Sequence, residues 1–112
     1  MEVMPIKIEI FQDEKGKEPF SKWVLSLSSS FRARVFARLD RMEIGNFGDF
    51  KSIGEGLFEL RLFFGAGYRI YYGNTNNKLI LLLCGGDKSS QKKDISIAKT
   101  YWKTYKEKEN II

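Results

Sequence analysis

The sequence predicts a single α+β domain in the order β-α-α-β-β-β-α, with an antiparallel meander sheet packed on a helical hairpin. Two patterns support this prediction. Between residues 18 and 44 apolar side chains recur every three or four positions, as on one face of a helix, whereas from Gly56 onward they alternate with polar ones. A chain of 112 residues is long enough for one core and too short for two. We therefore treat residues 1–112 as one domain.

The first half of the chain is predicted to form a strand and two helices. Ile6–Ile10 alternates apolar and polar residues, which is strand periodicity. A helix opens at residues 18–20, because proline is tolerated in a first turn. Its apolar face consists of Phe20, Trp23, Val24 and Leu27. A second helix spans about Phe31 to Ile44, and a serine among residues 28–30 is expected to cap it.

The second half is predicted to form three strands and a last helix. The strands cover residues 57–63, 68–72 and 78–84, and Gly-rich and Asn-rich turns separate them. The third strand is apolar after Lys78, so we expect it to be buried on both faces. Ser89 or Ser90 is expected to cap a helix that runs to about Tyr105. Residues 106–112 are expected to be frayed.

The composition narrows the possible functions. The formal charge is +5, from 19 Lys and Arg against 14 Asp and Glu, which favours nucleic acid or an acidic protein as partner, although many small proteins are mildly basic. The absence of histidine excludes His-based acid–base catalysis and His zinc sites. The one cysteine, Cys84, cannot form an internal disulfide and is expected to lie in the core. We find no membrane span and no signal region, so we expect a cytoplasmic protein. With no histidine and one cysteine, we also expect no metal or cofactor.

The strand register predicts a polar face on the sheet. Glu59 and Arg61 point away from the apolar side of their strand, and Arg69 and Tyr71 do the same on the next strand. The residues predicted to face the core from the first of these strands are Phe58, Leu60 and Leu62. If the helical hairpin covers the apolar face, the four polar side chains share the opposite one.

A charged segment leaves the third strand at the rim of this polar face. Residues 85–95 read GGDKSSQKKDI, and Lys51, in the loop before the meander, would reach the same rim. Gly85 and Gly86 alone are weak support for a phosphate loop, because no Walker-type Lys-Ser/Thr follows at the required spacing. The segment is thus expected to be a strand-to-helix turn and an active-site rim at once.

These residue types suit the chemistry of RNA phosphates. Arginines fixed on a sheet hold a phosphate through paired hydrogen bonds, lysines add charge, and Tyr71 would stack on a base or bind a phosphate oxygen. RNA cleavage by its own 2′-OH needs a proton acceptor, a proton donor and stabilised transition-state charge. Without histidine, the acceptor would be a desolvated Lys or Tyr, Glu59 or Asp87. The same side chains would equally form cross-strand pairs on a solvated sheet face.

Five stretches carry a resemblance to a known family. They are PFSKW (19–23), GNFGD (45–49), GLFELR (56–61), GYRIYY (67–72) and LLCGGDKSSQ (82–91). In this order, and over nearly the whole chain, they resemble the phage-derived addiction-module killer family, HigB-like members of the RelE/ParE toxin superfamily. The element order predicted above agrees with that superfamily.

The resemblance implies the toxin of a type II toxin–antitoxin system. Most RelE-like and HigB-like members are ribosome-dependent endoribonucleases that cleave mRNA in the A site without a metal, and this is the function we expect. The expected partner is a small helix-turn-helix antitoxin, through which alone the toxin would meet operator DNA. ParE-like members instead poison DNA gyrase, and this is the alternative. A third alternative is an inactive relative kept as a binding partner.

The resemblance also implies roles for single residues. Arg69 matches the arginine that stabilises the scissile phosphate, Arg61 lies on the preceding strand where such toxins place basic catalytic side chains, and Lys88 follows the last strand as another basic residue does. We further expect Glu59 and Asp87 to be catalytic residues that orient a base. The residues expected to contact RNA or the ribosome are Lys51, Tyr71, Gln91, Lys92 and Lys93. The chain departs from RelE in carrying Glu59 and Arg61 where RelE has two lysines. Tyr101 and Tyr105 are approximate counterparts of its C-terminal tyrosine.

Overall fold

A computed structural model describes residues 5–110 and places three α-helices and five strands in that range. The protein is α+β, as predicted, with a mixed sheet. The elements in chain order are β1 (Lys7–Ile10), α1 (Pro19–Leu25), α2 (Ser29–Glu43), β2 (Phe50–Gly54), β3 (Leu57–Arg61), β4 (Arg69–Thr75), β5 (Leu79–Gly86), a 3-10 turn (Lys88–Ser90) and α3 (Gln91–Lys108). No helix within residues 5–110 has the length and apolar character needed to cross a membrane.

The sheet has the strand order β1-β5-β4-β3-β2. The strands β2 to β5 form an antiparallel meander, as predicted for three of them, whereas β1 pairs in parallel with β5. Strand β2 was missed because four of its five residues are exposed, so this edge strand has no apolar alternation. The prediction that Lys51 lies in a loop was therefore wrong. It lies in β2, directly opposite Glu59 of β3.

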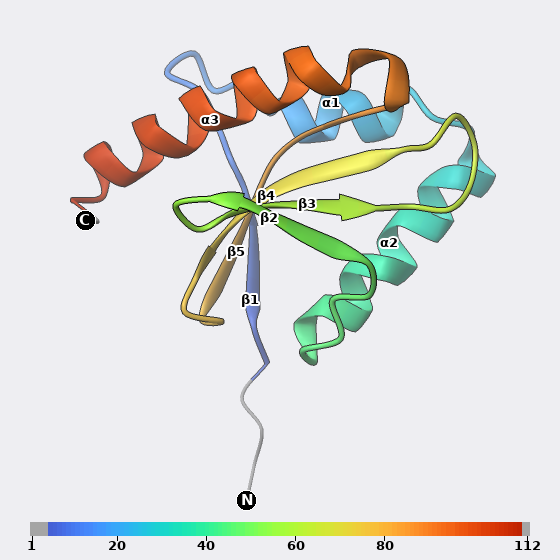
Figure 1. Ribbon diagram of the computed structural model, residues 1–112, viewed down its shortest axis with the longest axis horizontal. Coiled ribbons are helices and arrows are strands. Elements are labelled where there is room, and N and C mark those ends of the chain that lie inside the picture. The colour runs from blue at the N-terminus through green and yellow to red at the C-terminus, as the bar shows by residue number, and fades with distance from the viewer. Residues whose placement is uncertain (1–4, 111–112) are drawn as a thin grey trace, which may run out of the picture.

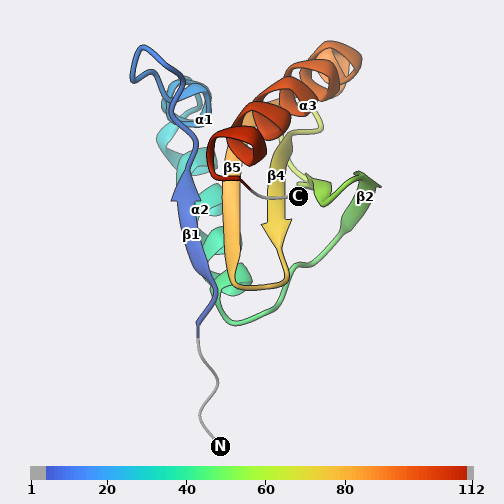
Figure 2. The ribbon, with the colours of Figure 1, turned by 90° about the vertical axis from the view of Figure 1, so that its left-hand side faces the viewer.

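Helices cover both faces of the sheet. In Figure 1 the sheet is seen almost edge-on, and Figure 2 shows α1 and α2 on one side of it and α3 on the other. Phe20 of α1 and Val35 of α2 pack on one face, against Leu60 and Ile70, while Trp102 of α3 packs on the other. The second face bears Leu57, Tyr71, Leu81 and Leu83. The expectation that this face is open and polar was wrong over its centre.

A close approach between α3 and β4 explains why the second face is covered. A Cβ built on Gly73 would overlap the ring of Trp102, so the missing side chain gives the indole its place. The indole Nε1 also donates a 2.7 Å hydrogen bond to the carbonyl oxygen of Glu55. Helix α3 continues to Lys108, so the predicted fraying was wrong for residues 106–108; residues 111–112 lie outside the described range.

Strand β5 is buried on both faces, as its apolar sequence predicted. Residues 80–83 are all at most 2% exposed, with Ile80 and Leu82 toward α1 and α2 and the other two toward α3. Cys84 is buried, as expected, and burial followed by the charge of Asp94 raises the pKa of its thiol to about 12. A thiol with this pKa stays protonated at neutral pH.

Candidate functional site

Two arginines lie side by side at the end of the sheet where β3 stops and β4 begins. Arg61 and Arg69 are directly opposite one another in the β3–β4 pair, so their side chains project from the same face. The first turns of α3 reach this end of the face, where Asp94 lies against Gly86, the β5 partner of Arg69, and 40% of the Arg61 side chain remains exposed. Like charges placed opposite each other destabilise a sheet unless another group compensates them.

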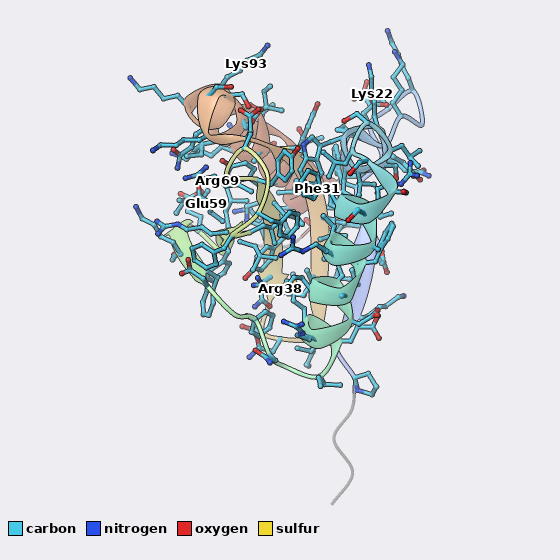
Figure 3. All side chains as sticks on the ribbon, turned by 90° about the vertical axis from the view of Figure 1, so that its right-hand side faces the viewer. Lys22, Phe31, Arg38, Glu59, Arg69 and Lys93 are labelled. Carbon is cyan, nitrogen blue, oxygen red and sulfur yellow. The ribbon has the colours of Figure 1, made fainter. Side chains whose placement is uncertain are left out.

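Glu59 is the compensating group. Its side chain is only 1% exposed, and its Oε1 lies 3.3 Å from Nε of Arg61 and 3.8 Å from Nε of Arg69. Its other oxygen, Oε2, accepts a 3.0 Å hydrogen bond from the side-chain amide of Gln91 in the first turn of α3. Figure 3 shows Glu59 and Arg69 close together near the start of α3. Within salt-bridge distance one negative charge thus faces two positive ones, while the charge of Asp87 interacts more weakly with Arg69.

Arg69 is held more tightly than Arg61. Its side chain is 15% exposed, and Nη1 donates a 2.7 Å hydrogen bond to the carbonyl oxygen of Gly67. Nε of Arg69 has no hydrogen-bond partner within residues 5–110. Because this nitrogen is buried and lies 3.8 Å from Oε1 of Glu59, the guanidinium is fixed in position beside the carboxylate, and contact with a phosphate would fall to its terminal nitrogens.

Lys88 approaches the cluster from the other side of the β3–β4 turn. Its backbone N–H donates a 3.3 Å hydrogen bond to the carbonyl oxygen of Ala66. Gly67, with φ of +73°, lies between the two basic residues, since a Cβ built on it would be 3.5 Å from both Nη1 of Arg69 and Cβ of Lys88. The Lys88 side chain is exposed, so its ammonium adds positive charge to the open side of the cluster.

Asp87 has a local structural role. Its carboxylate accepts hydrogen bonds from the backbone N–H of Ser89, at 2.8 Å, and from the Ser89 hydroxyl, and so caps the 3-10 turn before α3. These two bonds are the main reason that the pKa of Asp87 is lowered from its ordinary value of 3.8. A carboxylate with a lowered pKa is a weaker proton acceptor, which does not favour Asp87 as the base.

Tyr71 does not face outward as predicted. Its side chain is fully buried between the sheet and α3, and its hydroxyl has no hydrogen-bond partner in the described part of the chain. Burial, followed by the nearby charge of Glu59, raises the pKa of this phenol well above its usual value. The expectation that Tyr71 contacts RNA rested on an exposed sheet face, and the structure offers no accessible surface there.

The remaining predicted residues surround the start of α3. Gln91 is half-buried and occupied with Glu59, whereas Lys92 and Lys93 are exposed in the first turn. Figure 3 shows Lys93 pointing away from Arg69. Lys88, Lys92 and Lys93 add positive charge to this end of the protein, which Asp87 and Asp94 partly offset. Lys51 is exposed on the neighbouring β2.

Comparison with known proteins identifies the family. Residues 22–108 match the family described as "Phage derived protein Gp49-like (DUF891)". The chain belongs to this family. It is also 51% identical over 81 residues to an uncharacterized protein of Haemophilus influenzae (strain ATCC 51907 / DSM 11121 / KW20 / Rd), an alignment that covers 71% of this chain and 82% of the relative.

All the residues of the arginine cluster lie inside the part of the chain that matches the Gp49-like family, from Glu59 to Gln91. No three side chains of the metal-ligating types are grouped to hold a metal ion within the described range. Arg61, Arg69 and Lys88, with the exposed lysines around them, supply the positive charge at this end of the sheet, and Glu59 and Asp87 partly offset it.

The two tyrosines of α3 lie away from the arginines. Tyr101 is ten residues beyond Gln91, or about 15 Å along the helix. Its ring stacks on Phe11 with centroids 4.8 Å apart, and Tyr105 stacks on Trp102 at 5.8 Å. Burial raises the pKa of both phenols. Both tyrosines line a groove of about 1130 Å³ between α3 and the loop that follows β1, outside the arginine cluster.

Sequence reasoning missed two residues at this end of the sheet. Gly67 supplies the carbonyl that anchors Arg69, and Phe63 is 78% exposed in the turn after Arg61. The alternation that predicts Glu59 and Arg61 to face away from the core predicts the same for Phe63, because residue 63 continues this odd-numbered series. Nothing in the sequence indicates the Gly67 contact, which depends on how the turn closes.

Proposed function

We propose that this protein is the toxin of a type II toxin–antitoxin system, with a RelE/ParE toxin-like fold, and that it cleaves mRNA in the ribosomal A site. One observation carries the proposal. Arg61 and Arg69 stand opposite each other at one end of the sheet, and among the described residues Glu59 is the one carboxylate within salt-bridge distance of them. A polyanion is the partner that this arrangement favours. Membership of a phage-derived family and the HigB-like sequence stretches support the same function.

In the proposed reaction the substrate supplies its own nucleophile. The 2′-oxygen attacks the adjacent phosphorus, the bond from phosphorus to the 5′-oxygen breaks, and the proton lost from the 2′-OH is balanced by one gained at the 5′-oxygen. The products carry a 2′,3′-cyclic phosphate and a 5′-hydroxyl. Arg61 and Arg69 would bind the non-bridging oxygens, whose charge grows in the transition state.

The three residues considered as proton acceptors are each in an environment that does not favour this role. Asp87 has a lowered pKa and caps a turn, and Tyr71 is buried with a raised pKa. Glu59 is engaged by two guanidiniums and an amide, so we assign it to orienting the arginines. We therefore attribute most of the rate enhancement to positioning of the 2′-oxygen and to stabilised phosphate charge. Lys88, Lys92 and Lys51 would add to the positive field that attracts the RNA.

The proposal includes a protein partner. Following the resemblance, we infer that a small helix-turn-helix antitoxin binds this toxin and that the toxin meets operator DNA only through it. The arginine cluster leaves a large part of the surface free for such a partner, so a variant that removes one arginine should still bind the antitoxin. Antitoxin binding by such a variant would show that it is folded, so that a loss of toxicity can be assigned to catalysis.

The test is brief induction of the protein in cells, followed by primer extension on several mRNAs. We compare the wild type with Arg69→Ala and with Arg41→Ala, a control at an exposed position of α2. Cuts inside translated frames that require translation initiation, remain in Arg41→Ala and vanish in Arg69→Ala are the expected result. Growth arrest with intact transcripts and damaged DNA would favour a gyrase poison. No arrest by soluble, folded protein would favour an inactive binding partner.

A further inference from the structure

The turn between β3 and β4 contains two consecutive phenylalanines in opposite environments. Phe64 packs against the core formed by α1 and α2, whereas 78% of Phe63 is exposed, more than any other large apolar side chain within the described residues. Burial of a phenylalanine side chain normally stabilises a protein, so leaving this ring in water forgoes a favourable contribution. Single exposed apolar residues are common on protein surfaces, and Ile44 and Leu25 are 73% and 65% exposed, so the position of Phe63, more than its exposure alone, indicates a function.

The exposed ring is carried by an anchored turn. The Phe64 ring stacks on Phe31 of α2 with centroids 5.4 Å apart, and the guanidinium of Arg34 lies 4.3 Å above its centre. The backbone N–H of Leu62 donates a 2.9 Å hydrogen bond to the carbonyl oxygen of Tyr68, which closes the turn. Phe63 is thus presented by a structured segment, so little conformational freedom is lost when it binds something.

The direction of Phe63 follows from the alternation of its neighbours. Leu60, Leu62 and Phe64 all contact the core on the side of α1 and α2. The odd-numbered residues of the same run therefore belong to the other side, which Glu59 and Arg61 share. Phe63 lies two residues beyond Arg61, in the bend that follows the end of β3. Its exposed ring is therefore carried by the same end of the sheet as the two arginines.

We propose that Phe63 is a nucleobase-binding site of this protein. When Arg61 and Arg69 hold a phosphate, the base of a nucleotide joined to that phosphate would stack on the exposed ring. Base–aromatic stacking tolerates any base, so Phe63 would add affinity without sequence preference. This inference rests on the proposed function, because it takes the bound polyanion to be single-stranded RNA.

The test uses three substitutions that separate stacking from apolar contact. Phe63→Leu keeps an apolar side chain without a ring, Phe63→Tyr keeps the ring, and Phe63→Ala removes both. The control is Phe36→Ala, which removes another exposed phenylalanine, 48% exposed, from α2. Circular dichroism first establishes that each variant is folded.

The first readout is cleavage of mRNA on purified ribosomes at increasing concentrations of the protein. Loss of one stacked base weakens binding by about 5- to 150-fold. We therefore expect Phe63→Ala and Phe63→Leu to raise the half-saturating concentration by such a factor with little change in the rate at saturation. Phe63→Tyr and Phe36→Ala should resemble the wild type. Arg69→Ala should instead lose the rate at saturation.

The second readout is fluorescence of a short single-stranded RNA that contains one 2-aminopurine, which is quenched by stacking. Quenching by the wild type and by Phe63→Tyr, but not by Phe63→Leu, is expected. If Phe63→Leu cleaves and quenches like the wild type, the ring is not a stacking site, and the inference is wrong while the nuclease proposal stands. If Arg69→Ala cleaves like the wild type, the proposed function fails instead. If the wild type neither cleaves nor quenches, both are wrong.

Discussion

Replacing Glu59 by glutamine removes the single negative charge that the two arginines share. The substitution preserves the size of the side chain and one hydrogen-bond acceptor, so it changes mainly the charge. In the wild type, the carboxylate is 1% exposed and faces guanidiniums that are 15% and 40% exposed. After substitution, Arg61 and Arg69 remain opposite each other in the sheet with no compensating charge between them.

The magnitude follows from the burial of the partners. Loss of one member of a buried ion pair costs about 3–5 kcal/mol, but exposure of Arg61 reduces its share, because water screens that pair. Repulsion between the opposed arginines adds about 0.2–1 kcal/mol. We expect Glu59→Gln to lower the free energy of unfolding by about 2–3 kcal/mol. For a domain of this size that is a Tm roughly 8–12 °C lower.

Urea unfolding followed by circular dichroism measures this loss, and a double-mutant cycle identifies its cause. Arg61→Gln should destabilise the wild type slightly and should stabilise the Glu59→Gln variant, since it relieves the repulsion that remains there. We expect an interaction free energy of about 1–2 kcal/mol between the two sites. Additive effects, or a Glu59→Gln variant within about 0.5 kcal/mol of the wild type, would refute the account of the cluster.

Three further predictions concern the positions around this cluster. Gly73→Ala should lower the free energy of unfolding by about 1–3 kcal/mol in urea, because the new methyl group overlaps the Trp102 ring; an unchanged midpoint would contradict the packing of α3. Asp87→Ala should destabilise the protein at neutral pH, since the carboxyl group has a lowered pKa in the folded protein. In thermal melts, the difference in Tm between wild type and variant should disappear as the pH falls below 3.8. A difference in Tm that does not depend on pH would exclude the capping charge as its cause. Tyr71→Phe should leave toxicity unchanged and stability unchanged or slightly higher, because the buried hydroxyl has no hydrogen-bond partner among the described residues; loss of toxicity in a growth assay, with the variant still folded, would indicate a functional role for this phenol.

Much of the fold was predictable because its elements have clear periodicity. The apolar stripes of α1 and α2 and the alternation in β3 and β4 placed these elements correctly, and Ser28 caps α2 as the serine run indicated. Two features escaped prediction. Strand β2 is a polar edge strand, and the packing of α3 depends on Gly73, whose contact with a helix about thirty residues later leaves no local signal.

The candidate site was predictable as a set of residues more than as an arrangement. Alternation correctly placed Glu59, Arg61 and Arg69 together, and Lys88 does lie at the same end of the sheet. Tyr71 was misplaced because alternation says which face a side chain joins and not whether a helix covers that face. The hydrogen bond between Gln91 and Glu59 joins positions far apart in the chain, and only the tertiary structure brings them together.

The most direct test of the central claim is to incubate the purified protein with ribosomes stalled on a defined mRNA and to determine the chemical ends of any fragments. The account predicts cleavage within the A-site codon, fragments that carry a 2′,3′-cyclic phosphate and a 5′-hydroxyl, and no cleavage by a folded Arg69→Ala variant. Intact mRNA with the wild type, or equal cleavage by Arg69→Ala, would contradict it.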